Sequence, residues 1–114
     1  MKKLLIFGFS LFLLASCTPQ KQLYTWAKYE AASYNYVKNS DEESTQKLIE
    51  NYTKIIEEQK GTRGIVPPGV CADYGFLLLQ KGKAKEGKEM LMREIALYPE
   101  SKIFIDRILK MIEE

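Results

Sequence analysis

Side chains able to support catalysis are scarce in this 114-residue chain. It contains no histidine, which removes the commonest general base, the commonest metal ligand and every Ser–His or Cys–His nucleophile pair. Two pairs of carboxylates are adjacent, Glu57–Glu58 and Glu113–Glu114, and neighbouring positions on a helix point in different directions. We therefore expect no catalytic residue, no cofactor site and no metal site, and we predict that the protein is not an enzyme.

The two cysteines lie in different surroundings. Cys17 follows a short apolar run near the N-terminus, whereas Cys71 stands between Val70 and Ala72 in an apolar stretch. For Cys71 we favour the interpretation of a buried small hydrophobic residue. The alternative is a reactive or intermolecular thiol, because export would place it in an oxidising compartment without an intramolecular partner.

Residues 1–16 have the organisation of a secretory signal peptide. Lys2 and Lys3 precede an apolar run over residues 4–14, which is shorter than the roughly 20 residues of a membrane-spanning helix. Leu14-Ala15-Ser16-Cys17 resembles a bacterial lipobox, in which the cysteine sulfur receives a diacylglyceryl group and becomes the new N-terminus. The resemblance predicts lipidation of Cys17. An ordinary signal peptide that happens to precede a cysteine is the alternative.

The residue after the cysteine indicates the destination. It is Thr18, and not the aspartate that tends to retain lipoproteins in the inner membrane of enteric bacteria. The resemblance therefore implies a protein anchored by lipid in the outer membrane and facing the periplasm. Residues 17–22 would be the lipidated cysteine and its tether, whose polar part reaches at most about 18 Å. The folded part, residues 23–114, must then lie close to the bilayer.

Cleavage after residue 16 would change the charge balance. Lys2 and Lys3 are two of the 17 basic residues, so the remaining 98 residues carry 15 basic and 15 acidic side chains. A neutral chain has no general attraction for nucleic acid, and we expect neither nucleic acid nor a small-molecule substrate as a partner. A lysine cluster follows residue 80, and we interpret it as an exposed turn in preference to a phosphate or peptidoglycan site. It comprises Lys81, Lys83, Lys85 and Lys88.

Hydrophobic periodicity predicts an all-α domain of about five helices without a strand. The expected helices cover residues 23–37, 41–59, 67–81, 84–97 and 101–112. Ser40 is expected to cap the second helix, with Glu43 reaching back to its amide in a capping box. Gly61 is a plausible stop for that helix. Pro67 and Pro68 are expected in the first turn of the third helix, where proline is tolerated.

The third and fourth segments resemble one tetratricopeptide repeat, a helix–turn–helix unit of about 34 residues. Gly75 matches the glycine of its first helix, Gly87 matches the small residue of its second helix, and Pro99 matches its terminal proline. These glycines would let the two helices cross closely. A generic helical hairpin is the alternative. The first two segments fit less well, because Glu30 stands where glycine belongs when Trp26 takes the tryptophan position.

The chain as a whole resembles a family of small bacterial lipoproteins with a domain of unknown function. The resemblance rests on Leu23-Tyr24-Thr25-Trp26 with Tyr29-Glu30, Val66-Pro67-Pro68-Gly69, Ala72-Asp73-Tyr74-Gly75 and Tyr98-Pro99-Glu100-Ser101. Members usually have glycine where this chain has Ala27. Members are similar to tetratricopeptide proteins and tend to be encoded beside a lipoprotein resembling the curli secretion channel. The resemblance therefore implies another envelope lipoprotein as partner.

The first helical segment carries five aromatic residues, more than a short helix needs for its core. Some are expected to line a binding groove, and the alternative is that all of them pack against the second segment. The candidate partner-binding residues are Trp26, Tyr29, Tyr34, Arg63 and Tyr74. The expected function is that of a lipid-anchored scaffold or adaptor whose stacked helices hold a segment of a partner protein. The alternative is a periplasmic assembly factor or chaperone for exported polypeptides.

Replacing Cys17 with alanine tests the lipobox. Without the thiol no diacylglyceryl group can be attached, so we expect the variant to leave the membrane fraction and to remain unprocessed. Cell fractionation with immunoblotting measures both effects, and Cys71→Ala serves as the matched control because it leaves the lipobox intact. Normal processing and membrane retention of the Cys17→Ala variant would show that the anchor lies elsewhere.

Overall fold

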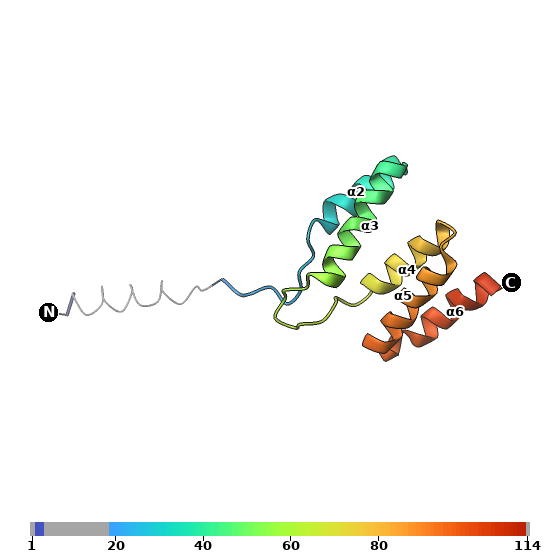
Figure 1. The fold of residues 1–114 in the computed structure, drawn as a ribbon. Coiled ribbons are helices and arrows are strands. Elements are labelled where there is room, and N and C mark those ends of the chain that lie inside the picture. Colours follow the sequence, from blue (N-terminus) through green and yellow to red (C-terminus); the bar gives the residue numbers. More distant parts are fainter. Residues whose placement is uncertain (1, 4–18, 114) are drawn as a thin grey trace.

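The computed structural model describes residues 2–3 and 19–113, and all regular secondary structure in residues 19–113 is helical (Figure 1). The five α-helices are α2 (Tyr29–Asn39), α3 (Glu42–Glu57), α4 (Val70–Gln80), α5 (Ala84–Leu97) and α6 (Lys102–Glu113), with a 3₁₀ turn η1 (Pro99–Ser101) before α6. No strand occurs in this part of the chain. The all-α prediction is confirmed, and α5 matches its predicted bounds. Cys17 and almost all of the predicted signal peptide lie outside the described residues.

The helices form two hairpins with α6 packed beside the second (Figure 1). α2 packs against α3 and α4 packs against α5, while α3 and α4 join the two hairpins. One buried cluster fills the junction between the hairpins. It comprises Leu48, Tyr52, Ile55, Val66, Val70, Cys71 and Leu77. A second cluster fixes α6 to the α4–α5 hairpin and comprises Ala72, Leu91, Ile105 and Ile108.

Two glycines set the separation of α4 and α5. A Cβ atom built on Gly75 would lie 2.8 Å from the carbonyl oxygen of Gly87, and one built on Gly87 would lie 2.8 Å from the carbonyl oxygen of Gly75. The Gly87 Cβ would also lie 2.8 Å from Cγ of Leu79. Because backbone atoms cannot move aside as a flexible side chain can, neither position accepts a larger residue without separating the helices. The predicted close crossing is confirmed.

The first helix begins later than predicted. Residues 23–28 are not helical, and α2 starts at Tyr29. Two features prevent an earlier start. Ala27 has a left-handed backbone with φ of 49°. The backbone of Thr25 is engaged by the side chain of Gln59, whose Oε1 accepts from Thr25 N at 2.5 Å and whose Nε2 donates to Thr25 O at 3.1 Å. Tertiary hydrogen bonds therefore hold this segment in a non-helical path.

The predicted cap of the second helix is wrong by one residue. Ser40 has a left-handed backbone, and its amide donates to the carbonyl of Tyr36, so it ends α2. Asp41 is the N-cap of α3 and forms the capping box with Ser44. The Ser44 amide donates to Asp41 Oδ1 at 2.8 Å and the Asp41 amide donates to Ser44 Oγ at 3.2 Å. Hydrogen bonding to the Ser44 side chain, and then to its backbone amide, lowers the pKa of the exposed Asp41 carboxyl.

Two further boundaries differ from prediction. α4 begins at Val70 with Gly69 as N-cap, so Pro67 and Pro68 precede the helix and do not occupy its first turn. The left-handed backbone of Gly69, with φ of 90°, separates them from it. α3 ends at Glu57, before Gly61. Gly61 lies against the N-terminal segment, where an added Cβ would come within 2.2 Å of the Leu23 carbonyl oxygen.

Enlarging either glycine of the α4–α5 crossing should destabilise the fold. We expect Gly75→Leu and Gly87→Leu each to lower the free energy of unfolding by about 1–3 kcal/mol through overpacking. In a domain of this size each kcal/mol lowers the melting temperature by about 4–8 °C. Thermal unfolding followed by circular dichroism measures the change. Ala96→Leu is the matched control, because Ala96 is exposed on α5. Equal melting temperatures for all three variants would contradict this account.

Candidate partner-binding groove

A row of aromatic rings runs from the N-terminal segment through both hairpins. Tyr24, Trp26, Tyr29, Tyr52 and Tyr74 contact one another in that order, with ring centroids 6.4, 5.6, 5.9 and 5.5 Å apart. The last pair is stacked, and burial raises the pKa of the Tyr52 hydroxyl well above its usual value. Aromatic pairs at these separations contribute more to the free energy of unfolding than the burial of their apolar surface alone. The row therefore explains much of the aromatic content as packing between elements.

The structure does not bring the five predicted partner-binding residues into one groove. Trp26, Tyr29 and Tyr34 line an open hollow of about 750 Å³ along α2. Trp26 is 42% exposed, and Tyr34 is 64% exposed with Lys38 Nζ 5.9 Å from its ring centroid. Tyr74 is half-buried against Tyr52, and Arg63 is exposed in the loop after α3.

Another surface forms a longer groove across three helices. One hollow, of about 360 Å³, lies between α2, α3 and α4, and Tyr29, Val37 and Tyr52 contribute to its walls. A second hollow, of about 280 Å³, lies between α4 and α6. Asp73 and Phe76 of α4 line both hollows, so the two lie next to each other. We call this surface the α2–α4–α6 groove.

Exposed apolar side chains surround the α2–α4–α6 groove. Val37 is 76% exposed, Phe76 44%, Phe104 61% and Met111 66%. Contiguous exposed apolar surface on a small domain usually marks an interaction site. Of the predicted candidates only Tyr29 lines this groove, and sequence reasoning missed the other four residues named here. A signal was present, because residues 101–112 hold more apolar side chains than one buried stripe can use.

Asp73 supplies the charge of the groove. It is the one ionisable acid or base lining either hollow apart from the tyrosines, and it lies beside Phe76 in both. Among the described residues no side chain forms an ion pair or a hydrogen bond with its carboxylate. Desolvation by its surroundings, and then the charge of Glu94, raise the pKa of Asp73. The groove is therefore a mainly apolar surface with one exposed, unpaired carboxylate where its two hollows meet.

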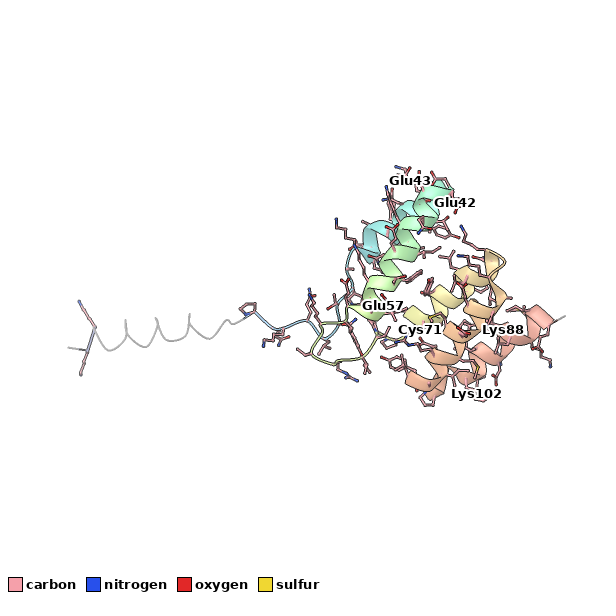
Figure 2. The ribbon with its side chains drawn as sticks, in the orientation of Figure 1. Glu42, Glu43, Glu57, Cys71, Lys88 and Lys102 are labelled. Carbon is pink, nitrogen blue, oxygen red and sulfur yellow. The ribbon has the colours of Figure 1, made fainter. Side chains whose placement is uncertain are left out.

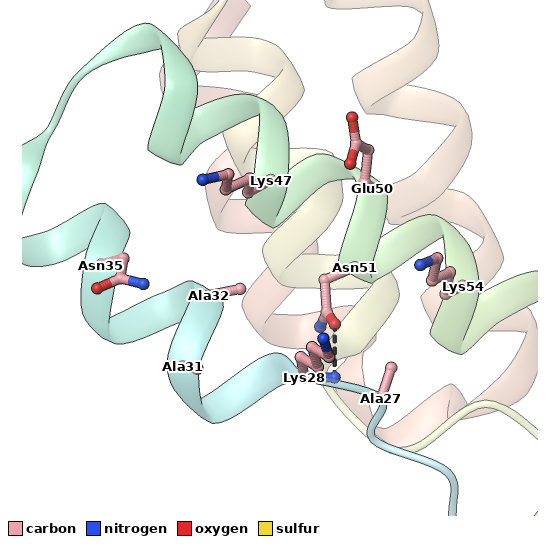
Figure 3. Close-up of a pocket in the computed structure, with 9 residues that line it drawn as sticks. All are labelled: Ala27, Lys28, Ala31, Ala32, Asn35, Lys47, Glu50, Asn51 and Lys54. Carbon is pink, nitrogen blue, oxygen red and sulfur yellow. Dashed lines mark hydrogen bonds between the residues drawn. The ribbon is translucent and has the colours of Figure 1, made fainter.

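A separate hollow of about 600 Å³ lies between α2 and α3 (Figure 3). One wall carries the small side chains of Ala31 and Ala32 from α2 and of Ala27 from the segment before it, and three lysines and a glutamate surround the hollow. Asn51 Oδ1 accepts a hydrogen bond from the Lys28 amide at 2.8 Å, which fixes the first turn of α2. The polar groups of this hollow thus position a helix end.

The N-terminal segment is fixed to the loop after α3. Thr62 N donates to Gln22 O and Arg63 N donates to Leu23 O, both at 3.1 Å. The Gln59 side chain completes this connection through its two hydrogen bonds with Thr25. The chain thus leaves the domain beside residues 59–63, at the end where α3 finishes (Figure 1).

Cys71 lies at the junction of the two hairpins and is completely buried (Figure 2). Burial raises the pKa of its thiol to about 11, so the thiol is protonated at neutral pH. The predicted role as a buried small hydrophobic residue is confirmed. The neighbouring Glu94 is also buried, and its Oε1 accepts a hydrogen bond from the Gly69 amide at the start of α4.

Comparison with known proteins assigns the chain to a family. A family model described as a domain of unknown function (DUF4810) matches residues 23–108, which is most of the chain, so the chain belongs to that family. No curated protein and no solved structure matches it. Within the described residues no helix is long and apolar enough to cross a membrane, and no three His, Cys, Asp or Glu side chains gather as metal ligands.

The environment of Cys71 predicts an inert thiol. Because the group is buried and protonated, we expect the folded protein to resist an aromatic disulfide reagent near neutral pH and to react with it fully once unfolded in denaturant. Absorbance of the released thiolate measures both rates. The Cys17→Ala variant should be used, so that only one thiol is counted. Rapid stoichiometric labelling of the folded protein would contradict the structure.

Proposed function

We propose that this protein is a lipid-anchored scaffold or adaptor of the outer membrane that holds a partner protein of the cell envelope in its α2–α4–α6 groove. The observation that carries the proposal is that two hollows lie side by side across α4. Phe76 and Asp73 line both, so one bound segment that passes over α4 can contact both hollows. A helix or an extended segment that buries apolar side chains suits such a surface.

The architecture supports a relationship with tetratricopeptide proteins. On this proposal α2–α3 and α4–α5 are successive repeats, and α6 is the first helix of another repeat or a cap. The Gly75–Gly87 crossing supports the assignment for the second hairpin. The first helices of the successive units, α2, α4 and α6, then line one side of the stack, where such arrays form binding surfaces.

The position of the N-terminal segment supports action close to a membrane. If Cys17 carries lipid, the chain is free only between that residue and Gln22, whose carbonyl is bonded to Thr62. Such a tether reaches at most about 18 Å. A second anchored protein would therefore meet the groove at high effective concentration, and modest intrinsic affinity would suffice for a complex.

The proposed partner is another envelope lipoprotein, and one similar to the curli secretion channel is the specific candidate. The resemblance of the chain to small bacterial lipoproteins supports this choice, and it belongs to the proposal together with the outer-membrane location. A scaffold that binds such a partner needs no catalytic group. The scarcity of catalytic side chains in the sequence, which lacks histidine, agrees with that role.

Photo-crosslinking in living cells tests the groove with a matched pair of methionines. A photoreactive residue at Met111, in the groove, should give one discrete adduct of defined mass. The same residue at Met92, on α5 outside the groove, should not. The two positions are comparably exposed, at 66% and 55%. Crosslinking should precede detergent extraction, because extraction removes the high effective concentration that two proteins anchored in one membrane have for each other.

Mass spectrometry of the adduct identifies the partner. A single envelope lipoprotein in stoichiometric yield would support the scaffold. Diffuse, low-yield adducts with many exported polypeptides from Met111 would instead favour the periplasmic chaperone or assembly factor. Equal adducts from Met111 and Met92 would reject the groove as the binding surface.

A further inference from the structure

The chemistry of the α2–α4–α6 groove restricts what can occupy it. Its lining is mainly apolar and aromatic, with Phe76 beside Asp73 in each hollow and Ser33 and Gln80 as the neutral polar members of the first hollow. A fully apolar segment would cover the carboxylate and remove it from water without a compensating partner, which is costly. An acidic segment would add repulsion. A segment that places a positive charge beside Asp73 supplies both a hydrogen-bond donor and a counter-charge, so it compensates the carboxylate better than a neutral donor does.

We propose that the groove recognises a protein segment in which one lysine or arginine lies between two apolar side chains. The charge of the basic residue pairs with Asp73. One apolar side chain fills the hollow between α2, α3 and α4, and the other fills the hollow between α4 and α6. This inference rests on the proposed function and names the chemistry of the partner. An arginine would be favoured over a lysine where both carboxylate oxygens are free, because its planar donors bind a carboxylate in pairs.

The position of Asp73 on α4 does not by itself explain why a carboxylate without a counter-ion stands there. It lies in the first turn of α4, where the helix dipole favours a carboxylate. The dipole stabilises the charge but provides no counter-ion, and the side chains around it supply none. Asp73 is itself exposed, so its raised pKa reflects partial desolvation by the groove walls and then the charge of Glu94, and its carboxylate loses the remaining water only when a ligand covers it. The contrast with Glu42 is direct, because that carboxylate pairs with Lys81, the C-cap of α4, at 2.7 Å.

The chain itself offers one competing occupant. Arg107 lies on α6 between Phe104 and Met111, so a second copy could present a basic residue flanked by apolar ones. We favour a different protein, because α6 already forms one wall of the groove. In a symmetric pair of copies each α6 would have to serve as wall and as ligand at once. Self-association is therefore an outcome that the experiment must be able to detect.

The experiment selects peptides from a random-sequence library displayed on phage. The full chain, purified as cells process it, is immobilised through a C-terminal tag. Parallel selections use the wild type, Asp73→Lys and the matched control Glu89→Lys, which reverses an exposed charge on α5. We expect wild type and control to enrich apolar peptides with a central basic residue, and Asp73→Lys to enrich an acidic residue there.

Binding measurements with one selected peptide give the magnitude. Asp73→Asn should weaken binding about tenfold, which is about 1.4 kcal/mol, while Glu89→Gln should leave it unchanged. Phe76→Ala and Phe104→Ala should also weaken binding, because they remove the walls of the second hollow. Melting curves of all variants confirm that each one folds.

The remaining outcomes separate this inference from the proposed function. Selected peptides whose binding requires Phe76 and Phe104 but whose central residue shows no preference for positive charge would overturn the inference. They would leave the proposal of groove binding intact. Peptides that ignore both residues, or no enrichment at all, would overturn both. Sedimentation of the wild type is the last measurement. A dimer that Phe104→Glu dissociates would assign the groove to a second copy and overturn the inference.

Discussion

The contact between Gly75 and Gly87 is the constraint on which the rest of the second hairpin depends. Because neither residue has a Cβ, α4 and α5 approach until the backbone of each lies where a side chain would be. This contact fixes the rotation of α4 about its axis. The face with Gly75 points to α5, and the helical period then turns Asp73 and Phe76 toward the groove. The third face, with Val70 and Cys71, closes the junction with the first hairpin.

A second constraint links the N-terminal segment to the body. The Gln59 side chain accepts a hydrogen bond from the amide of Thr25 and donates one to its carbonyl oxygen. Two backbone hydrogen bonds join Gln22 and Leu23 to the loop that follows α3. These bonds decide where the chain leaves the folded domain. The exit point matters for function, since it sets which end of the helical stack faces any surface to which the N-terminus is attached. The aromatic row begins at the same place and stabilises it.

Polar groups in this fold serve two separate purposes. Asn51, Glu94 and Gln59 each bond to a backbone amide at a chain turn or helix start, while Nδ2 of Asn51 and Oε2 of Glu94 are buried without a hydrogen-bond partner among the described residues. Asp73 has no such duty, and it lies in the apolar groove. An unpaired carboxylate costs little while water reaches it but becomes costly when a ligand covers it. Membership of a family with a domain of unknown function adds no mechanism, so the chemistry of this groove is the most specific guide to a role.

The sequence by itself determined the helical class, the bounds of α5, the burial of Cys71 and the glycine crossing of α4 and α5. Each of these features follows from local periodicity or from the absence of a side chain, so it could be predicted without knowing which distant residues pack together. Tertiary structure alone decided where the N-terminal segment stops being helical, because hydrogen bonds from Gln59, more than 30 residues away, outweigh its local pattern. It also decided the groove. Val37, Phe76 and Phe104 come from three helices that are distant in the sequence, and only the packing of those helices brings the three side chains to one surface.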